Sequence, residues 1–276
     1  MLASVIKRTL TSSHFRKRLL HRPRERVVVV IPVYRDRMTH AEDVSFRRCV
    51  AVLGHYPIAL AAPEGLPVEA YTSLCPGLRV KRFPAPFFDG IQGYNQLTLS
   101  VSFYESFADY AYMLIYQLDC YVFRDELKDW CRRGYDYIGA PWMGAYSQQA
   151  FYRQTLDKAV RRETPVKRAA RRLLGRRFED VGNGGLSLRK VKTFIVALTV
   201  LAHRVKTWPY YEDLFFSVLV PILDLTFRVP DRRTAMRFSV ETSPEECYAL
   251  LGNTLPFGCH APEKYGKQFW PKFMHP

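Results

Sequence analysis

The stretch Arg26-Val27-Val28-Val29-Val30-Ile31-Pro32 decides the fold. From Val27 to Ile31 it is an unbroken run of β-branched side chains, which ends at a proline. A strand with one wet face alternates apolar and polar residues, whereas a run that is apolar at every position predicts a strand buried on both faces. Strands of that kind belong to parallel sheets that helices cover on both sides. The stretch therefore predicts the first strand of an α/β sheet.

Similar apolar runs recur along the chain and alternate with segments of helical periodicity. This alternation predicts an α/β domain with a central, mostly parallel sheet flanked by helices. In such sheets ligands bind outside the carboxyl ends of the strands, so chemistry is expected just after each strand. The further strands expected are 56–63, 78–83, 110–117, 135–141 and 184–188; the helices are 43–53, 95–107, 125–133, 190–204 and one that Glu212 opens.

Length and composition are those of a globular protein. The chain has 276 residues, of which 48% are hydrophobic and 24% charged, so it can bury a sizeable core. These values exclude a wholly disordered chain, a collagen-like fibre and a disulfide miniprotein.

No apolar run reaches the roughly 18 residues of a membrane-spanning helix, and no apolar stretch of a secretory signal follows the basic start. The six cysteines form no CxxC pair, which predicts reduced thiols in a reducing compartment.

The formal net charge of +15 is confined to two segments. Residues 1–26 hold eight Lys/Arg and one Glu, and residues 153–177 hold ten Lys/Arg and two acids. The rest of the chain is balanced. The expected organisation is thus a basic amphipathic N-terminal arm over 1–26 and one domain over 27–276 with a basic insertion at 153–177.

Both basic segments show an apolar stripe at helical spacing. For the arm, this pattern predicts a helix lying on an anionic membrane surface. For the insertion, a solvated basic helix that packs its stripe on the domain is an equal alternative. Nucleic acid is not expected as a partner, because no zinc-finger spacing, RNP-type motif or helix-turn-helix pattern accompanies the charge.

Common nucleotide-binding and hydrolase motifs are missing from the sequence: it has no GxGxxG, no GxxxxGK[ST] and no GxSxG. Polar residues instead gather at the predicted strand ends and at one helix start. Five motifs carry them: QLDCYVF (117–123), YDYIGAPW (135–142), GNGGLSLR (182–189), EDLFF (212–216) and PFGCHA (256–261).

In this order and spacing, the motifs resemble the GT-A fold glycosyltransferases, and look closest to a little-characterised bacterial family of cell-surface polysaccharide enzymes. The resemblance runs from about Val27 to His260. It implies a single GT-A-like (Rossmann-like) domain, a nucleotide-sugar donor with UDP as the expected nucleotide, and a divalent cation, Mn²⁺ or Mg²⁺. The sugar would pass to a hydroxyl of a saccharide or lipid-linked saccharide, at the cytoplasmic face of the inner membrane.

The resemblance assigns the metal site to Asp119 and His260. A divalent cation that bridges diphosphate oxygens prefers carboxylate ligands. The family's Asp-x-Asp reads Asp119-Cys120-Tyr121 here, so one of the two acids is present. His260 resembles the C-terminal histidine that completes this site. The structural alternatives are a strand-end cap for Asp119 and a hydrogen-bonded histidine in the core.

Catalysis is assigned to the pair Glu212-Asp213. Inverting transfer needs one general base for the acceptor hydroxyl, and Asp213 is the expected base. A helix N-terminus favours a carboxylate, so Asp213 is expected to be ionised. Glu212 would orient it or bind the acceptor. The alternative is that both acids only cap a helix.

The donor site is expected at three strand ends and at the start of a helix, where Tyr94 and Asn95 would touch the ribose or base. Tyr34 would stack on the base and Arg35 would reach a phosphate, while the GNGG turn would line the sugar; a plain turn is the alternative. Trp142 would stack on a sugar or fill the core. The expected donor-binding residues are Pro32, Tyr34, Arg35, Tyr94, Asn95, Gln117, Asp119, Asn183, Gly184 and Gly185.

Two other function classes stay open at the sequence level. The incomplete Asp-x-Asp is compatible with a nucleotide-binding or scaffolding protein of GT-A fold that has lost catalysis. The charge of +15 is compatible with a nucleic-acid-binding protein, the weaker alternative.

Overall fold

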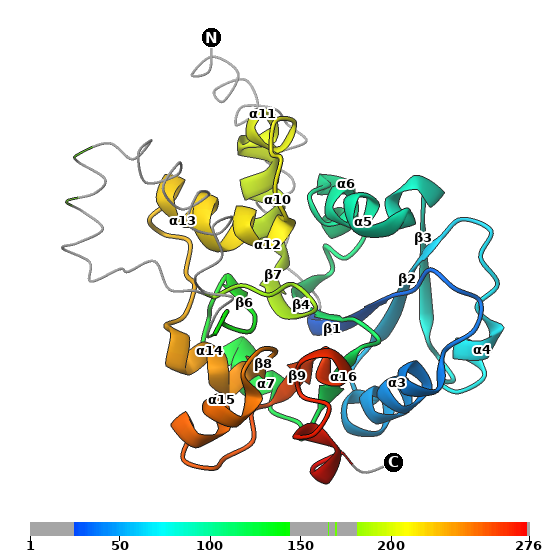
Figure 1. The fold of residues 1–276 in the computed structure, drawn as a ribbon. Coiled ribbons are helices and arrows are strands. Elements are labelled where there is room, and N and C mark those ends of the chain that lie inside the picture. The colour runs from blue at the N-terminus through cyan, green and yellow to red at the C-terminus, as the bar shows by residue number, and fades with distance from the viewer. Residues whose placement is uncertain (1–24, 144–164, 166–168, 170–180, 275–276) are drawn as a thin grey trace.

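A six-stranded mixed sheet forms the centre of the molecule (Figure 1). The computed structural model describes residues 25–143, 165, 169 and 181–274. The strand order is β3-β2-β1-β4-β7-β6, in which β1 to β4 are parallel and β7 runs antiparallel to both neighbours. The strands are β1 (Glu25–Pro32), β2 (Ile58–Pro63), β3 (Arg79–Phe83), β4 (Tyr110–Tyr116), β6 (Tyr137–Ile138) and β7 (Leu186–Lys190). The predicted α/β class with a mostly parallel sheet is confirmed.

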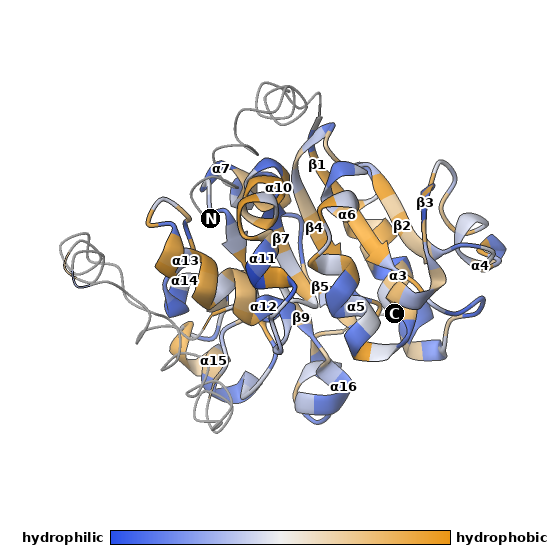
Figure 2. Cartoon of the chain, turned by 90° about the horizontal axis from the view of Figure 1, so that it is seen from above, coloured by the Kyte–Doolittle hydropathy of each residue, from blue (hydrophilic) through white to orange (hydrophobic). Residues whose placement is uncertain are grey.

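Strand β1 is buried on both faces, as its sequence predicts. Residues 27–31 are at most 2% exposed. Val27, Val29 and Ile31 pack into the core on one face of the sheet, and Val28 and Val30 into the core on the other. Figure 2 shows the strands as the hydrophobic centre of the molecule.

Helices cover both faces of the sheet. On one face, the core includes side chains of α3 (His40–Leu53), α4 (Glu69–Thr72) and α7 (Leu127–Arg132). On the other face it includes side chains of α5 (Gly90–Thr98), α6 (Val101–Glu105) and α10 (Val191–Val200). The two groups lie on opposite sides of β1 in Figure 1.

A second, three-stranded sheet was not predicted, and it positions part of the site. Its order is β5-β9-β8, formed by β5 (Cys120–Val122), β9 (Gly258–His260) and β8 (Ser239–Val240). Strands β5 and β9 are antiparallel, and Cys120 faces His260 across the pair. The sheet thus joins residues about 140 positions apart in the chain.

Shorter elements complete the fold. The helical run that Glu212 opens is confirmed, but its middle turn, η3, is a π-helix. Pro221 has no N–H to give to the preceding turn, which favours a looser register there. The elements are η1 (Ala85–Phe88), α11 (Ala202–Val205), α12 (Glu212–Leu214), η3 (Phe215–Leu219), α13 (Val220–Leu223), α14 (Arg232–Phe238), α15 (Pro244–Leu250), α16 (Pro262–Tyr265) and η4 (Trp270–Lys272).

The expected helix 95–107 is wrong as a single element. It is two helices, α5 and α6, and it begins earlier, at Gly90. The Ser100 hydroxyl donates to the Leu97 carbonyl at 2.7 Å and accepts from the Phe103 N–H at 3.3 Å. A serine that caps a new helix competes with continuation of the old one, so the chain breaks at this point.

The expected strand 135–141 is also shorter than predicted, since β6 spans two residues. The N–H groups of Asp136 and Tyr137 donate to the carbonyl of Arg228. The expected helix 190–204 is divided into α10 and α11, and the strand expected at 184–188 runs instead from Leu186 to Lys190.

The basic arm and insertion fall almost entirely outside the described residues, so their helical character stays a prediction. Arg26, at the end of the arm, donates to the Cys131 carbonyl at 3.2 Å. All six cysteines are free thiols, as predicted, and all six are buried. In the part of the chain that the structure describes, no helix is long and apolar enough to cross a membrane.

Candidate functional site

The site lies where β4 ends and β7 begins. Because β7 is antiparallel to β4, its first residue pairs with the last residue of β4, Tyr116 with Leu186. The next backbone contact joins Gln117 and Gly185: the Gln117 N–H donates to the Gly185 carbonyl at 3.0 Å. The QLDC and GNGG motifs are therefore side by side at the carboxyl edge of the parallel strands.

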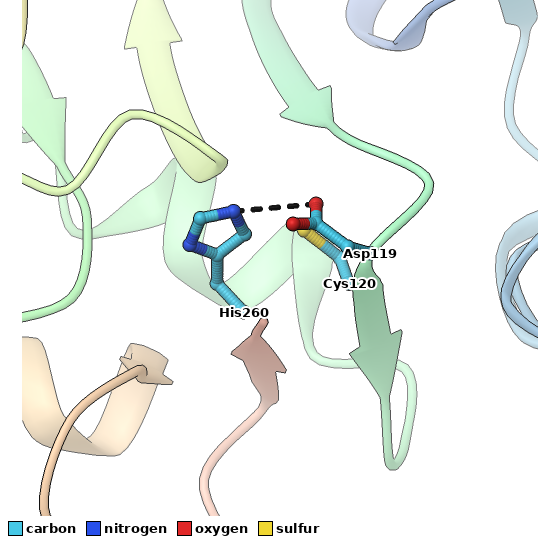
Figure 3. A group of neighbouring side chains, drawn as sticks. All are labelled: Asp119, Cys120 and His260. Carbon is cyan, nitrogen blue, oxygen red and sulfur yellow. Dashed lines mark ion pairs between the residues drawn. The ribbon is translucent and has the colours of Figure 1, made fainter. Parts of the chain in front are cut away.

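Asp119 and His260 meet at this edge (Figure 3). The Oδ1 atom of Asp119 is 3.3 Å from Nε2 of His260. The backbone fixes the pair, since the Ala261 N–H donates to the Asp119 carbonyl at 2.8 Å. Asp119 keeps a half-exposed side chain, whereas that of His260 is 11% exposed. The two residues assigned to metal binding are thus brought together.

Both ring nitrogens of His260 face oxygen atoms. Nε2 is 3.2 Å from Oε1 of Gln117, and Nδ1 is 3.0 Å from Oε1 of the buried Glu241. Burial lowers the pKa of His260, but hydrogen bonds to Asp119 and Glu241 outweigh it and raise the pKa to about 10. Burial raises the pKa of Asp119, but the hydrogen bond from His260 outweighs burial and lowers the pKa. In the metal-free chain, the pair is an imidazolium beside a carboxylate.

The donor set fits a divalent cation. Ligand atoms of Asp119, Cys120 and His260 lie within 4.8 Å of one another. Burial raises the pKa of the Cys120 thiol well above its usual range, and its sulfur contacts the Gly185 carbonyl at 3.3 Å. The thiol is therefore protonated without a metal, and sulfur is a soft donor that suits Zn²⁺ better than Mn²⁺ or Mg²⁺. The carboxylate of Asp119, the imidazole of His260 and the amide oxygen of Gln117 remain, and the two oxygen donors suit Mn²⁺ or Mg²⁺.

Two glycines allow the close approach around this cluster. A Cβ on Gly185 would lie 2.2 Å from Nε2 of His260, and a Cβ on Gly184 would lie 2.3 Å from Oε1 of Glu212. Neither distance is possible for a real side chain. The Asn183 side chain fixes the turn by accepting from the Gly185 N–H at 2.9 Å. The GNGG segment is therefore packed against both assigned groups rather than being a plain turn.

A buried ion pair holds Glu212. The Arg189 Nη2 atom is 2.7 Å from Oε1 of Glu212, and both side chains are at most 4% exposed. Arg189 also donates to the Tyr104 hydroxyl at 2.8 Å, and the Asn95 side chain accepts from the Glu212 N–H at 2.9 Å. Breaking such a pair leaves an uncompensated buried charge, which costs about 3–5 kcal/mol. Glu212 is thus a fixed group.

Asp213 differs from the expectation that it is ionised. Burial and the neighbouring Glu212 raise the pKa of Asp213 well above its usual range, and Glu241 adds to the shift. These effects outweigh the dipole of the helical run 212–223, in whose first turn Asp213 lies. The Leu214 N–H donates to Oδ1 of Asp213 at 2.7 Å, so the side chain does cap its own helix. Its catalytic role stays a prediction.

The residues expected to hold the donor base follow β1, at the same edge of the sheet. Pro32 ends β1, and the Tyr34 side chain is 56% exposed with the Arg35 guanidinium 5.1 Å from its ring centre. Burial raises the pKa of the Tyr94 hydroxyl, which lies near Arg189 and Glu212 rather than at the surface. Trp142 is partly buried and packs against the cluster of α12 and α13 side chains.

Sequence reasoning missed two residues of the site. Arg189 belongs to the quoted GNGGLSLR motif but had no role; a charge inside an apolar strand is a signal that could have found it. Glu241 follows the two-residue strand β8 and belongs to none of the motifs. Only the fold brings it to His260.

A protein-family comparison covers the site. A family described as "Protein of unknown function (DUF5672)" matches residues 77–260, two thirds of the chain. The chain belongs to this DUF5672 family. The matched region contains Asp119, the Glu212-Asp213 pair and, as its last residue, His260. Comparison with curated proteins gives no match.

Solved structures similar to this DUF5672 member include glycosyltransferases. An active-site mutant of LgtC is 15% identical, with 84% of this chain and 86% of that chain covered and a TM-score of 0.48. The bifunctional glycosyltransferase WbbM is 11% identical, with coverages of 87% and 46% and a TM-score of 0.49. Core-mannan synthase A from Aspergillus fumigatus, in an Mn/GDP form, is 10% identical, with coverages of 77% and 74% and a TM-score of 0.48. Because these identities and TM-scores are low, a function has to be argued from the residues of the site.

Proposed function

We propose that the chain is a metal-assisted, inverting glycosyltransferase that uses a nucleotide-sugar donor. The observation that carries this proposal is the GNGG turn. Gly185 contacts His260 of the candidate metal pair, and Gly184, the residue before it, contacts Glu212 of the acid pair. Adjacent Cα atoms are about 3.8 Å apart, so one donor–acceptor pair can reach both groups.

Asp119, His260 and the Gln117 amide oxygen would hold the divalent cation. When bound, such a cation offsets the negative charge of the diphosphate leaving group. The exposed Tyr34 ring would stack on the donor base, a uracil in the proposed UDP-sugar, and Arg35 beside it would pair with a phosphate. The missing side chains at Gly184 and Gly185 would let Glu212 and His260 lie against the turn, so that the turn lines the site of the sugar.

Asp213 would act as general base on the acceptor. The acceptor oxygen attacks the anomeric carbon, the bond from that carbon to the diphosphate breaks, and the hydroxyl proton passes to Asp213. The raised pKa makes its carboxylate a stronger base than an ordinary aspartate. Glu212, held by Arg189, keeps a fixed carboxylate beside the reacting groups.

The acceptor would be a saccharide or lipid-linked saccharide of bacterial cell-surface polysaccharide synthesis. This part of the proposal is supported by the sequence resemblance and by the charge distribution. The two basic segments would attract the anionic inner membrane, where lipid-linked acceptors are found.

Thermal stabilisation by nucleotides tests the proposal. UDP, GDP, CMP and dTDP are each added with and without Mn²⁺, followed by hydrolysis assays with the corresponding sugar donors. We expect one nucleoside diphosphate to stabilise the chain only with Mn²⁺, and Asp119→Ala to abolish that stabilisation and lower turnover by about 100-fold or more.

Other outcomes would favour the competing functions. Metal-independent stabilisation without donor hydrolysis would indicate a binding protein that has lost catalysis. Stabilisation by polynucleotides alone would indicate nucleic-acid binding. Near-normal turnover of Asp119→Ala would contradict the metal assignment.

A further inference from the structure

Glu241 is a buried carboxylate at the edge of the candidate site. It follows β8 directly, is 7% exposed, and its Oε1 atom lies 3.0 Å from Nδ1 of His260. Removing a carboxylate from water costs several kcal/mol, so an apolar side chain would fill this position at lower cost. The contact with His260 offers a reason for the acid.

The contact decides which nitrogen of His260 faces the site. A proton on Nδ1 donates to Glu241, so the second ring nitrogen, Nε2, points to the other side. There it lies 3.3 Å from Oδ1 of Asp119 and 3.2 Å from Oε1 of Gln117. Histidines that bind a metal through one nitrogen usually donate the other N–H to a carboxylate or carbonyl, which fixes the ring and its tautomer.

We propose that Glu241 is the positioning residue of the cation site, an inference that rests on the metal-assisted function proposed above. Glu241 holds the Nδ1–H of His260, so that Nε2, once cation binding releases its own proton, presents its lone pair at the point shared with Asp119 and Gln117. It does not touch the cation or the substrate.

Glu241 also lies near the other half of the site. Burial and Glu212 are the larger causes of the raised pKa of Asp213, and Glu241 raises it further. One buried carboxylate thus acts on both His260 and Asp213. The short strand β8, which pairs with β9 in parallel, fixes its backbone next to His260.

The Mn²⁺ affinity of full-length variants tests the proposal. Glu241→Leu removes the acceptor at similar size, and Glu241→Gln keeps an amide oxygen that accepts from Nδ1–H but lacks the charge. Glu245→Gln, on exposed α15, is the matched control. Electron paramagnetic resonance of free Mn²⁺ should give an affinity about 10–100-fold weaker for Glu241→Leu, an intermediate value for Glu241→Gln and no change for the control. Wild-type affinity in Glu241→Leu overturns the proposal.

Nitrogen-15 chemical shifts of His260 in the metal-free chain separate this inference from the proposed function. A protonated, hydrogen-bonded Nδ1 in wild type and Glu241→Gln, and a changed Nδ1 shift in Glu241→Leu, support the positioning role. The same Nδ1 shift in all three chains overturns it. A wild-type chain that binds no Mn²⁺ overturns the metal site of the proposed function, and the shifts still decide the role of Glu241. If Glu241→Leu does not fold, weaker Mn²⁺ binding by Glu241→Gln at unchanged Tm supports the proposal, and unchanged binding overturns it.

Discussion

At the scale of single residues, charge and close contact define the site. Four acids, Asp119, Glu212, Asp213 and Glu241, surround the two bases Arg189 and His260. His260 and Arg189 each pair with an acid, while Asp213 is left with acids as its main neighbours. Two predictions belong to this scale.

The first residue-scale prediction concerns Gly185→Ala. The new methyl group would lie 2.2 Å from Nε2 of His260, so the ring or the turn has to move. We expect a loss of about 1–3 kcal/mol in the free energy of unfolding and a Mn²⁺ affinity at least about tenfold weaker. Denaturant unfolding and Mn²⁺ titration measure the two effects, with Ser73→Ala on the exposed end of α4 as control. Normal Mn²⁺ binding by Gly185→Ala would place the cation elsewhere.

The second residue-scale prediction concerns Asp213→Asn. The amide keeps the shape but cannot accept the proton, so turnover should fall by about 10²–10⁴-fold with donor KM little changed. The base works when deprotonated and its pKa is raised, so wild-type turnover should increase as pH rises above the usual carboxylate range, and the variant should lose this dependence. A raised pKa also means that the folded state loses stability as pH rises above the unfolded-state pKa, so the variant should unfold at an equal or higher Tm at neutral pH.

Product stereochemistry provides the control for that mechanism. Proton NMR of the product should show an inverted anomeric configuration. Retention of configuration would contradict the role of Asp213 as base, whatever the turnover of Asp213→Asn.

At the scale of elements, short segments place the key side chains. Strands β5, β9 and β8 have two or three residues each, yet they carry Cys120, His260 and the residue before Glu241. Helix α14 runs directly into β8, so its position sets that of Glu241. One prediction tests this connection.

The element-scale prediction concerns the N-cap of α14. Asp231 accepts from the backbone N–H and the hydroxyl of Thr234, each at 2.8 Å. Asp231→Ala should lower the free energy of unfolding by about 1 kcal/mol, whereas Asp231→Asn, which keeps the acceptor, should cost less. Burial raises the pKa of Asp231, but the Thr234 hydrogen bonds outweigh it and lower the pKa.

The sign of the pH effect at α14 follows from that lowered pKa. The ionised Asp231 side chain contributes to stability above its unfolded-state pKa of about 4. This contribution is lost as pH falls through its folded-state pKa. Urea unfolding at pH 7 and at decreasing acidic pH should show the difference between wild type and Asp231→Asn disappear. A constant difference would show that the cap acts without its charge.

At the scale of the whole molecule, a balanced domain carries two basic segments. The charge excess lies in residues 1–26 and 153–177, and the described sheet begins at Glu25, beyond nearly all of the arm. Folding of the domain therefore should not depend on the arm, whereas attraction to an anionic surface should. Each basic residue near such a surface contributes about 1 kcal/mol, within a Debye length.

The whole-molecule prediction is the deletion of residues 1–22. The shortened chain should fold with an unchanged Tm and still hydrolyse donor, but it should lose binding to vesicles that contain anionic lipid. Binding of the intact chain should weaken as salt concentration rises, which co-sedimentation measures. Activity on a membrane-embedded acceptor should fall more than activity on a soluble analogue. Unchanged co-sedimentation would contradict membrane binding by the arm and make residues 153–177 the candidate for it.

The sequence by itself determined what depends on local pattern. The apolar run 27–31 predicted a strand buried on both faces because every side chain in it avoids water. The order of the motifs pointed to Asp119, His260 and the Glu212-Asp213 pair, and the structure brings the first two into contact. It also places Asn95 and the GNGG turn against Glu212.

Only the tertiary structure decided the rest, because those features depend on contacts between distant segments. The pairing of β5 with β9 joins Cys120 to His260, and no periodicity in either segment predicts it. Glu241 reaches His260 through a two-residue strand, too short to leave a pattern. The pKa of Asp213 is set by burial and by acids that the fold gathers, which override the local helix start. Long-range packing thus fixed the chemistry of residues whose positions the sequence had already indicated.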